Sequence, residues 1–521
     1  MPSAETRKSY KSPVRKLMRF FEKSRNQWKA KHHQVKRRLK RFQNRMRVLD
    51  KREERRKSQV EELEAEVARL RAREQALVQE VAQLKTRALE APSAFSRAAG
   101  FAVAPYHHAY TLGQIGLFLA LVFSAAASLR CAARVIEIVV AVFGLTLPCP
   151  AWSTGREWLL RVGYYKLTRP KVQADDWVWI VDHTVQVGAE KCLVILGVRL
   201  CNLPPAGHSL SHAEVEPIEL LPVRHSDGEV VYQQLEKAIA KTGVPREIVS
   251  DHGTDVKAGI EKFCGQHPQT SAIYDIKHKT AAMLKRELEH EPAWLTFTQQ
   301  ASHTQSQLRQ TDWAALTPPS QKTKARYMNV DVLVDWGQAT LALLDRLPHS
   351  VTPPFDPDQV KQKLGWVADY RPHLEVWGEI FQVIATAESC VRQQGLYHGA
   401  QADLKKRLRG MAHTAPARRV RDELVTFVAQ EESKAHPHER LLGSSEVIES
   451  VLGKMKRLEQ HQAKSGFTGL ILGLSAMVAT TTHEIIQTAL ETVPTKKVWA
   501  WCQDVLGPSV QAKRRAIFSS G

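Results

Sequence analysis

The sequence predicts a multidomain protein of the α plus α/β class. At 521 residues the chain is longer than one typical domain. Between Asp176 and Lys279, β-branched and aromatic runs of strand length give way to alternating strand and helix patterns. The segments on both sides of this region show helical periodicity instead. We therefore expect one mixed sheet flanked by helices, joined to several helical units.

The charge of the chain is strongly basic. It contains 74 Lys and Arg against 54 Asp and Glu, a formal net charge of +20. Such an excess favours a polyanionic partner, nucleic acid first and an anionic membrane surface second. Residues 1–58 hold much of the excess, so we expect a basic DNA-binding arm there. A solvated tail is the alternative.

Residues 59–90 carry an apolar heptad pattern. Its positions are Val60, Leu63, Val67, Leu70, Leu77, Val81 and Leu84. This pattern predicts a coiled coil, which is too short to be stable without a partner helix. We expect a homodimer or higher oligomer, with an intramolecular hairpin as the alternative.

The cellular location is inferred from two features. The seven cysteines are scattered without a CxxC pair, which suits a reducing compartment, and the first ninety residues are too charged for a signal peptide. We expect a cytoplasmic, nucleoid-associated protein. Residues 110–129 are free of charge and long enough to cross a bilayer, so a membrane-associated coiled-coil scaffold is a further alternative. The same pattern continues through Arg130, Arg134 and Glu137, which disfavours a span.

Residues 101–170 resemble a helix-turn-helix DNA-binding domain. A helical pattern is followed by a turn at 144–150 and a second helix that Ser153 or Thr154 would cap. The second helix would present Arg156 and Arg161 to DNA.

Two aspartates mark the predicted sheet in residues 171–291. Asp182 lies in the first strand, in "WIVDHT", and Asp251 ends the fourth, in "IVSDHGTD". Adjacent parallel strands would bring them within a few ångströms of each other. Oxygen ligands of this kind suit Mg²⁺, and a two-ion site needs a shared carboxylate with one further carboxylate for each ion.

The β-β-β-α-β-α-β order of this region is that of the RNase H-like fold. "VDHT" and "SDHGTD" resemble the matching segments of DDE transposases of bacterial insertion sequences. The resemblance implies two Mg²⁺ ions, with Mn²⁺ as a substitute, bound by two aspartates and a glutamate. It also implies metal-dependent cleavage at transposon ends and transfer of the 3′-OH into target DNA. Double-stranded DNA would be the partner, and an inactive DNA-binding or regulatory descendant is the alternative.

The third acid has two candidates. Glu287 follows Asp251 at the spacing of retroviral-type integrases, but Glu289 and Glu291 on the same helix make that agreement uninformative. The competing candidate lies beyond residues 292–440, which we expect to be an all-helical insertion. There "SSEVIES" is similar to the "TTNAIES" segment of Mutator-type transposases, and this similarity makes Glu449 the ligand.

Three further observations bear on the site. "YDIKH" resembles the Cys/Asp-x-x-His signature of Mutator-type and hAT-type transposases, which makes Asp275 and His278 markers of a split catalytic core. Glu449 lies near the start of a helix capped by a Gly-Ser-Ser cluster, where the helix dipole favours a carboxylate. His252 would orient a water or contact a phosphate. The assigned DNA contacts of residues 441–521, the C-terminal helices and basic tail of the core, are Lys454 and Lys456.

Overall fold

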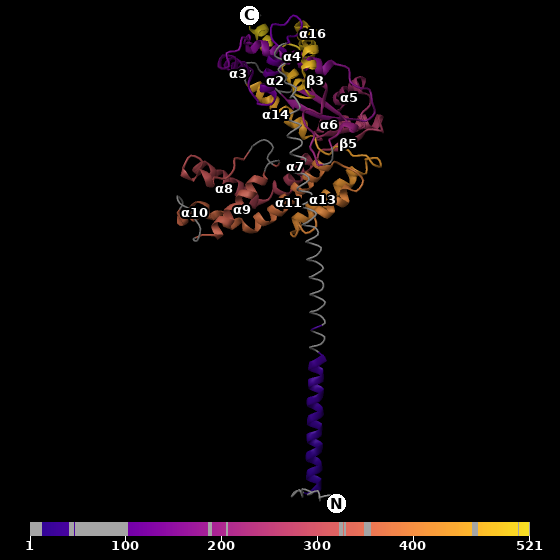
Figure 1. The fold of residues 1–521 in the computed structure, drawn as a ribbon, viewed down its shortest axis with the longest axis vertical. Coiled ribbons are helices and arrows are strands. Elements are labelled where there is room, and N and C mark those ends of the chain that lie inside the picture. The colour runs from indigo at the N-terminus through magenta and orange to yellow at the C-terminus, as the bar shows by residue number, and fades with distance from the viewer. Residues whose placement is uncertain are drawn as a thin grey trace, which may run out of the picture. The chain divides into compact units, whose positions relative to one another are not determined.

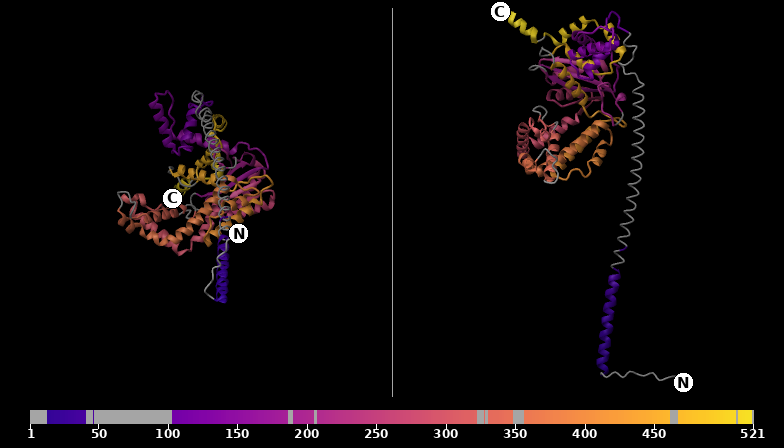
Figure 2. Two further views of the ribbon diagram at one scale, coloured as in Figure 1. Left: turned by 60° about the horizontal axis from the view of Figure 1, so that its bottom comes forward. Right: turned by 60° about the vertical axis from the view of Figure 1, so that its left-hand side comes forward.

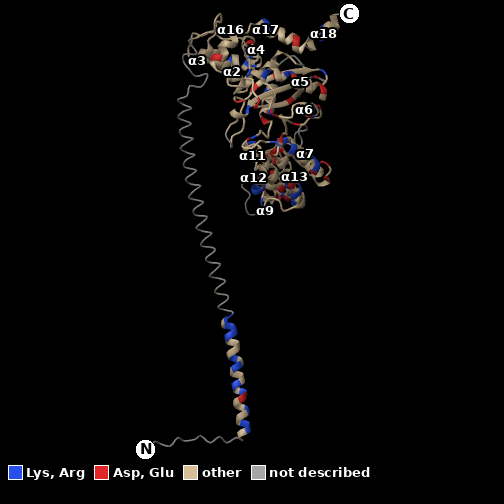
Figure 3. Ribbon diagram, turned by 90° about the vertical axis from the view of Figure 1, so that its right-hand side faces the viewer, with Lys and Arg blue, Asp and Glu red and all other residues tan. Residues whose placement is uncertain are grey.

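The computed structural model describes residues 13–40, 46, 103–185, 190–204, 207–321, 327, 330–347, 356–460, 467–508 and 510–519. It divides into two compact units, residues 1–93 and 94–521. In the first unit, residues 14–40 form one helix with Lys and Arg spread along its length (Figure 3). The predicted coiled coil at 59–90, and most of the predicted arm beyond residue 40, lie outside the described residues.

The second unit contains a five-stranded mixed sheet (Figure 1). Its strands are β1 (Trp177–Val185), β2 (Lys191–Arg199), β3 (Glu216–Val223), β4 (Glu247–Ser250) and β5 (Ser271–Tyr274). The strand order is β3-β2-β1-β4-β5, in which β1, β2 and β3 are antiparallel while β1, β4 and β5 are parallel. The prediction of a mixed sheet with flanking helices is therefore confirmed.

Helices cover both faces of the sheet because its central strands are apolar on both sides. Along β1, Trp177, Trp179 and Val181 belong to the core under α5 (Gly228–Thr242) and α6 (Thr254–Gln266). Val178 and Ile180 belong to the opposite core, which contains α14 (Glu446–Gln460). Because strand side chains alternate, Asp182 shares the α14 face.

Residues 103–168 form three helices, α2 (Leu112–Phe123), α3 (Leu129–Val142) and α4 (Trp152–Thr168). The N-cap of α4 is Ala151, so the predicted cap at Ser153 or Thr154 is wrong. Helix α2 is 12 residues long and ends at Ser124, well short of the roughly 20 residues that a membrane span needs. Within the described ranges, no helix has the length and apolarity to span a membrane.

The segment between α7 (Ile276–Leu288) and α14 is helical in its described residues, except for one isolated bridge from Leu396 to Leu441. Figure 2 shows its helices grouped apart from the sheet. They are α8 (Pro292–Leu308), α9 (Asp331–Asp345), α10 (Pro357–Leu364), α11 (Arg371–Gln394), α12 (Ala400–Arg407) and α13 (Ala415–Glu432). This segment therefore separates the two parts of the chain that form the sheet region.

The sequence predicts one apolar helix after α14, but the structure divides it into α15 (Leu472–Met477) and α16 (His483–Thr492). The buried ammonium of Lys166 explains the break. Its Nζ donates to the carbonyls of Ala476, Val478 and Ala479 at 3.1, 2.7 and 2.7 Å, and lies 2.7 Å from Oγ1 of Thr481. Carbonyls directed at a lysine do not continue a helical ladder. Two further helices follow, α17 (Thr495–Trp501) and α18 (Val510–Ser519).

Candidate functional site

Asp182 and Asp251 lie at the carboxyl ends of neighbouring parallel strands. Val181 of β1 pairs with Ser250 of β4, so the next residue of each chain segment is an aspartate at the same edge. Adjacent strands are about 4.8 Å apart, which places the two carboxylates in one small region. The strand register thus brings together the first two predicted site residues.

The backbone after Asp251 is held in a tight turn. Asp251 Oδ1 accepts a hydrogen bond from the backbone N–H of Gly253 at 2.9 Å. His252 between them has a φ of +58°, and its ring stacks on Tyr274 at a centroid distance of 4.1 Å. A non-glycine residue in this left-handed region costs free energy and is common at functional sites. Burial and the charges of Lys257 and Lys434 lower the pKa of His252 to about 4, so its ring is neutral at pH 7.

Glu449 reaches the same region from α14. Its Oε1 lies 2.7 Å from Nε2 of His278, which belongs to the first turn of α7. Both side chains are about one quarter exposed, at 28% and 26%. The predicted marker histidine and the predicted third acid are therefore direct partners, although the helical segment of residues 292–440 separates them in sequence.

Asp275 links the two helices that carry this pair. One of its oxygens, Oδ1, accepts from the backbone N–H of His278 at 2.8 Å and so caps α7. The other, Oδ2, accepts from the backbone N–H and the hydroxyl of Ser445, at 2.5 and 3.0 Å, directly before α14. Asp275 is fully buried. This carboxylate therefore acts as a shared cap that fixes the start of α14 beside the start of α7.

The chain that returns from the helical segment is fastened to the strands before it reaches α14. Arg246 donates to both carboxylate oxygens of Glu439, at 2.9 and 2.7 Å. The buried Glu247 accepts from the backbone N–H of Leu442 at 3.0 Å, and the carbonyl of Gly443 accepts from Ile276 N–H at 3.1 Å. These contacts deliver Glu449 to the sheet edge.

Burial and the contact between His278 and Glu449 shape the electrostatics of the site. Burial, followed by the charge of Asp251, raises the pKa of Asp182 to about 7, and Glu449 adds to the shift. Burial opposes the ionised form of Glu449, but the hydrogen bond and charge of His278 lower its pKa overall. Burial would lower the pKa of His278, yet the contact with Glu449 and the nearby carboxylates raise it.

The donor atoms of this region suit a hard divalent cation. Asp182, Asp251 and Glu449 offer carboxylate oxygens, and burial, followed by the charge of Asp251, raises the pKa of Asp182. A second set of potential ligand atoms, from Asp275, His278 and Glu449, lies within 4.8 Å of one another. Both oxygens of Asp275 are already hydrogen-bonded, which leaves them less available to a cation.

The alternative acid, Glu287, faces the helical segment instead of the strand ends. Its carboxylate lies 2.9 Å from Arg419 of α13 and 3.6 Å from Arg286. Its side chain is 13% exposed. These contacts account for Glu287 as an ion-pair partner within the helical layer.

The predicted DNA contacts have different surroundings. Arg161 is half-buried, and its guanidinium donates to the carbonyls of Leu490 and Val493 at the end of α16. It is therefore engaged inside the protein, because α4 packs against α2, α3, α15, α16 and α17. Arg156 lies instead in an open groove, where its guanidinium stands over the ring of Trp499.

On α14, the two predicted lysines also differ. The ammonium of Lys454 donates to the Phe123 carbonyl at 3.2 Å and lies 3.2 Å from Nδ1 of His212. Lys456 is exposed. Of the two, the exposed Lys456 is the better placed to meet a phosphate.

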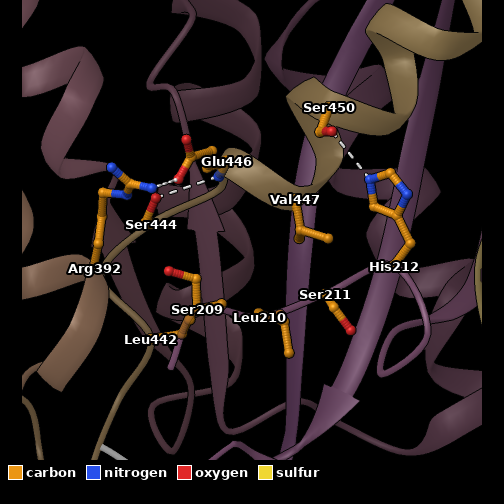
Figure 4. A pocket seen from close by; sticks show the side chains of 10 residues that line it. All are labelled: Ser209, Leu210, Ser211, His212, Arg392, Leu442, Ser444, Glu446, Val447 and Ser450. Atoms are coloured by element: carbon orange, nitrogen blue, oxygen red, sulfur yellow. Dashed lines mark hydrogen bonds and ion pairs between the residues drawn. The ribbon is translucent and has the colours of Figure 1, made fainter. Parts of the chain in front are cut away.

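Sequence reasoning missed a cleft of about 400 Å³ along the start of α14 (Figure 4). Arg392 of α11 forms an ion pair with Glu446 at 2.6 Å on one side of it. His212 lies 3.1 Å from the Ser450 hydroxyl on the other side. The residue types in "SSEVIES" gave no indication of these distant partners, which only the folded chain brings to the cleft.

Comparisons with known proteins are limited to structure. No protein-family model and no curated protein matches the sequence. Among solved structures, the chain is similar to the Drosophila P element transposase strand transfer complex, with a TM-score of 0.36 and 12% sequence identity. The alignment covers 72% of this chain and 93% of that chain.

Proposed function

We propose that this protein is a DDE-type DNA transposase with an RNase H-like core. The observation that carries the proposal is that Asp182 and Asp251 follow paired residues of β1 and β4, while α14, which carries Glu449, packs against β1. The strand order and the parallel arrangement of β1, β4 and β5 support the RNase H-like core.

Each acidic residue has a defined part in the proposed reaction. In this proposal Asp182 would be the ligand that both ions share, and Asp251 and Glu449 would each complete one ion. Two bound Mg²⁺ or Mn²⁺ ions would supply charge neutralisation at the scissile phosphate and activation of the attacking oxygen. His278 Nε2 lies 2.7 Å from Glu449 Oε1 and would restrict the orientation of that carboxylate. The chain thus contributes ligands and geometry for phosphodiester cleavage at element ends and for attack of the freed 3′-OH on target DNA.

The substrate class follows from charge. A net charge of +20 suits a protein that must hold several double-stranded DNA segments near one another. In residues 14–40, eleven Lys and Arg side chains accompany a single acid, Glu22. We expect DNA affinity to fall steeply with salt, because each phosphate contact releases counterions.

The proposal is tested with a DNA fragment that carries the inverted repeats flanking the gene. Purified protein with Mg²⁺ is expected to nick the repeat ends and join them to a second DNA. Glu449→Gln should abolish both products, whereas the matched variant Glu287→Gln should retain activity within about twofold, since its contacts are surface ion pairs. Full activity of Glu449→Gln would show that the assignment of Glu449 as the third ligand is wrong.

The same assay separates a transposase-derived regulatory protein from an active enzyme. A regulatory protein would bind the fragment in a gel-shift experiment but would not cut it with Mg²⁺ or Mn²⁺. The arrangement of three intact acids favours the active enzyme.

A further inference from the structure

A groove of about 1100 Å³ lies between α4 and the C-terminal helices. Two exposed tryptophans line it, Trp152 at the start of α4 and Trp499 in α17, each 43% exposed. Large aromatic rings are costly to leave in water, and exposed ones of this size often mark contact surfaces. The proposed reaction makes no use of this groove.

Each tryptophan has an arginine over its ring. The guanidinium of Arg130 lies 5.3 Å from the Trp152 ring centroid, and that of Arg156 lies 5.4 Å from the Trp499 ring. Arg156 also contacts Glu157 at 3.1 Å, but no acidic side chain is among the described residues that line the groove. The lining therefore combines flat aromatic surfaces with positive charge.

We propose that this groove binds unpaired nucleotides of a DNA strand. Bases stack on tryptophan faces regardless of sequence, and arginines beside them attract the phosphates. Paired bases inside a duplex do not expose their faces, so the groove is expected to prefer single-stranded over double-stranded DNA. Only the choice of DNA over RNA rests on the proposed function.

Binding of a fluorescent oligothymidylate to the full chain tests this site without any cleavage step. Trp152→Ala and Trp499→Ala should each weaken binding about five- to a hundredfold, and Phe at either position should restore most of it. Trp313→Ala is the matched control, since Lys363 stands 5.3 Å from that ring in a different part of the chain. It should leave the affinity unchanged.

A duplex of the same length provides the second measurement. Both groove variants should bind it as the unchanged protein does. The proposal would be overturned if the unchanged protein and both groove variants bound oligothymidylate with equal affinity. It would also be overturned if the variants lost equal affinity for the single strand and for the duplex. Failure of the cleavage assay with intact oligonucleotide binding would refute the proposed function alone.

A separate observation concerns the helix of residues 14–40. Six of its exposed apolar side chains fall on one heptad frame, three, four or seven residues apart, with exposed fractions from 54% to 73%. These residues are Val14, Met18, Phe21, Trp28, Val35 and Leu39. In sequence, the same heptad frame continues without a shift through Phe42, Met46 and Leu49 to Val60 and Leu63.

We infer that this apolar face pairs with the same face of a second copy of the chain. In sequence, the apolar positions of residues 14–39 and those of residues 60–84 fall in one heptad frame, interrupted by some polar residues, and a shared frame favours one partner for both. Lys29, Lys31, Lys36 and Arg38 flank the seam, and Lys31 of one copy would face Lys36 of the other in a parallel pair. Because like charges repel there, neutralisation by DNA phosphates should strengthen the pairing.

Cross-linking at single introduced cysteines tests the inferred face. Val35→Cys on the seam should form an intermolecular disulfide faster than the neighbouring Gln34→Cys, which points outward in the same frame. Addition of a short DNA duplex should accelerate disulfide formation by Val35→Cys but not by Gln34→Cys. Equal rates for the two variants would overturn the inference, and the native cysteines give both the same background.

Discussion

The Nε2 atom of His278 lies 2.7 Å from the Oε1 atom of Glu449, although 171 positions separate the two residues. His278 lies in the first turn of α7, before the helical segment, and Glu449 lies in the first turn of α14, after it. The contact therefore joins the two ends of that segment at the strand edge.

Replacing His278 should loosen Glu449 without removing a ligand. We expect His278→Ala to lower cleavage about tenfold to a hundredfold, mainly by raising the Mg²⁺ concentration needed for half-maximal rate. A Mg²⁺ titration of the cleavage rate checks this, and His278→Gln should recover part of the loss. His290→Ala makes the same kind of change at an exposed position and should have no effect. An unchanged Mg²⁺ requirement for His278→Ala would contradict the positioning role.

Asp275 should be sensitive to the loss of a single oxygen. An asparagine in its place offers one acceptor instead of two, so the N–H of His278 or that of Ser445 would lose its partner. We expect Asp275→Asn to reduce the free energy of unfolding by roughly 1–3 kcal/mol. Urea denaturation measures the change, and the exposed Asp335→Asn serves as the control. Equal stability of the two variants would exclude the shared cap.

Asp182 should make stability depend on pH and on cations. Its folded pKa of about 7 exceeds the unfolded value of about 3.9, so the folded protein binds more protons between these values. The contribution is therefore fully present below about pH 4 and is lost as the pH rises through about 7. At pH 8 in EDTA, Asp182→Asn should be more stable than the unchanged protein by roughly 1–3 kcal/mol.

Thermal unfolding at several pH values measures this difference. Mg²⁺ should raise the melting temperature of the unchanged protein at pH 8 and have a smaller effect on Asp182→Asn, because a bound cation stabilises only the state that holds it. A difference between the two proteins that stays constant from pH 4 to pH 8 would refute the shifted pKa.

Lys166 should be required for the break between α15 and α16. Methionine fills a similar volume but leaves the carbonyls of Ala476, Val478 and Ala479 without their buried donor. We expect Lys166→Met to lower the free energy of unfolding by about 2–5 kcal/mol. Chemical denaturation measures this change, and the exposed Lys497→Met serves as the control variant. If Lys166→Met lost no more free energy of unfolding than Lys497→Met, the buried ammonium would be excluded as the cause of the break.

The sequence by itself determined the strands of the sheet and two acids at their ends. Alternating and continuous apolar runs specify β1, β2, β3, β4 and β5 locally, and Asp182 and Asp251 follow from their place in those strands. The Gly-Ser-Ser cluster likewise indicated where α14 begins. These features depend on residues close together in the chain.

Only the tertiary structure decided how distant segments combine. Glu287 and Glu449 both fit a sequence pattern, and the contacts of Asp275 with Ser445 and of His278 with Glu449 bring α14 to the strand edge. Arg161 looked like a surface arginine until α16 supplied its carbonyl partners. No local pattern encodes such pairs, because their free energy arises from groups that meet only when the chain has folded around them.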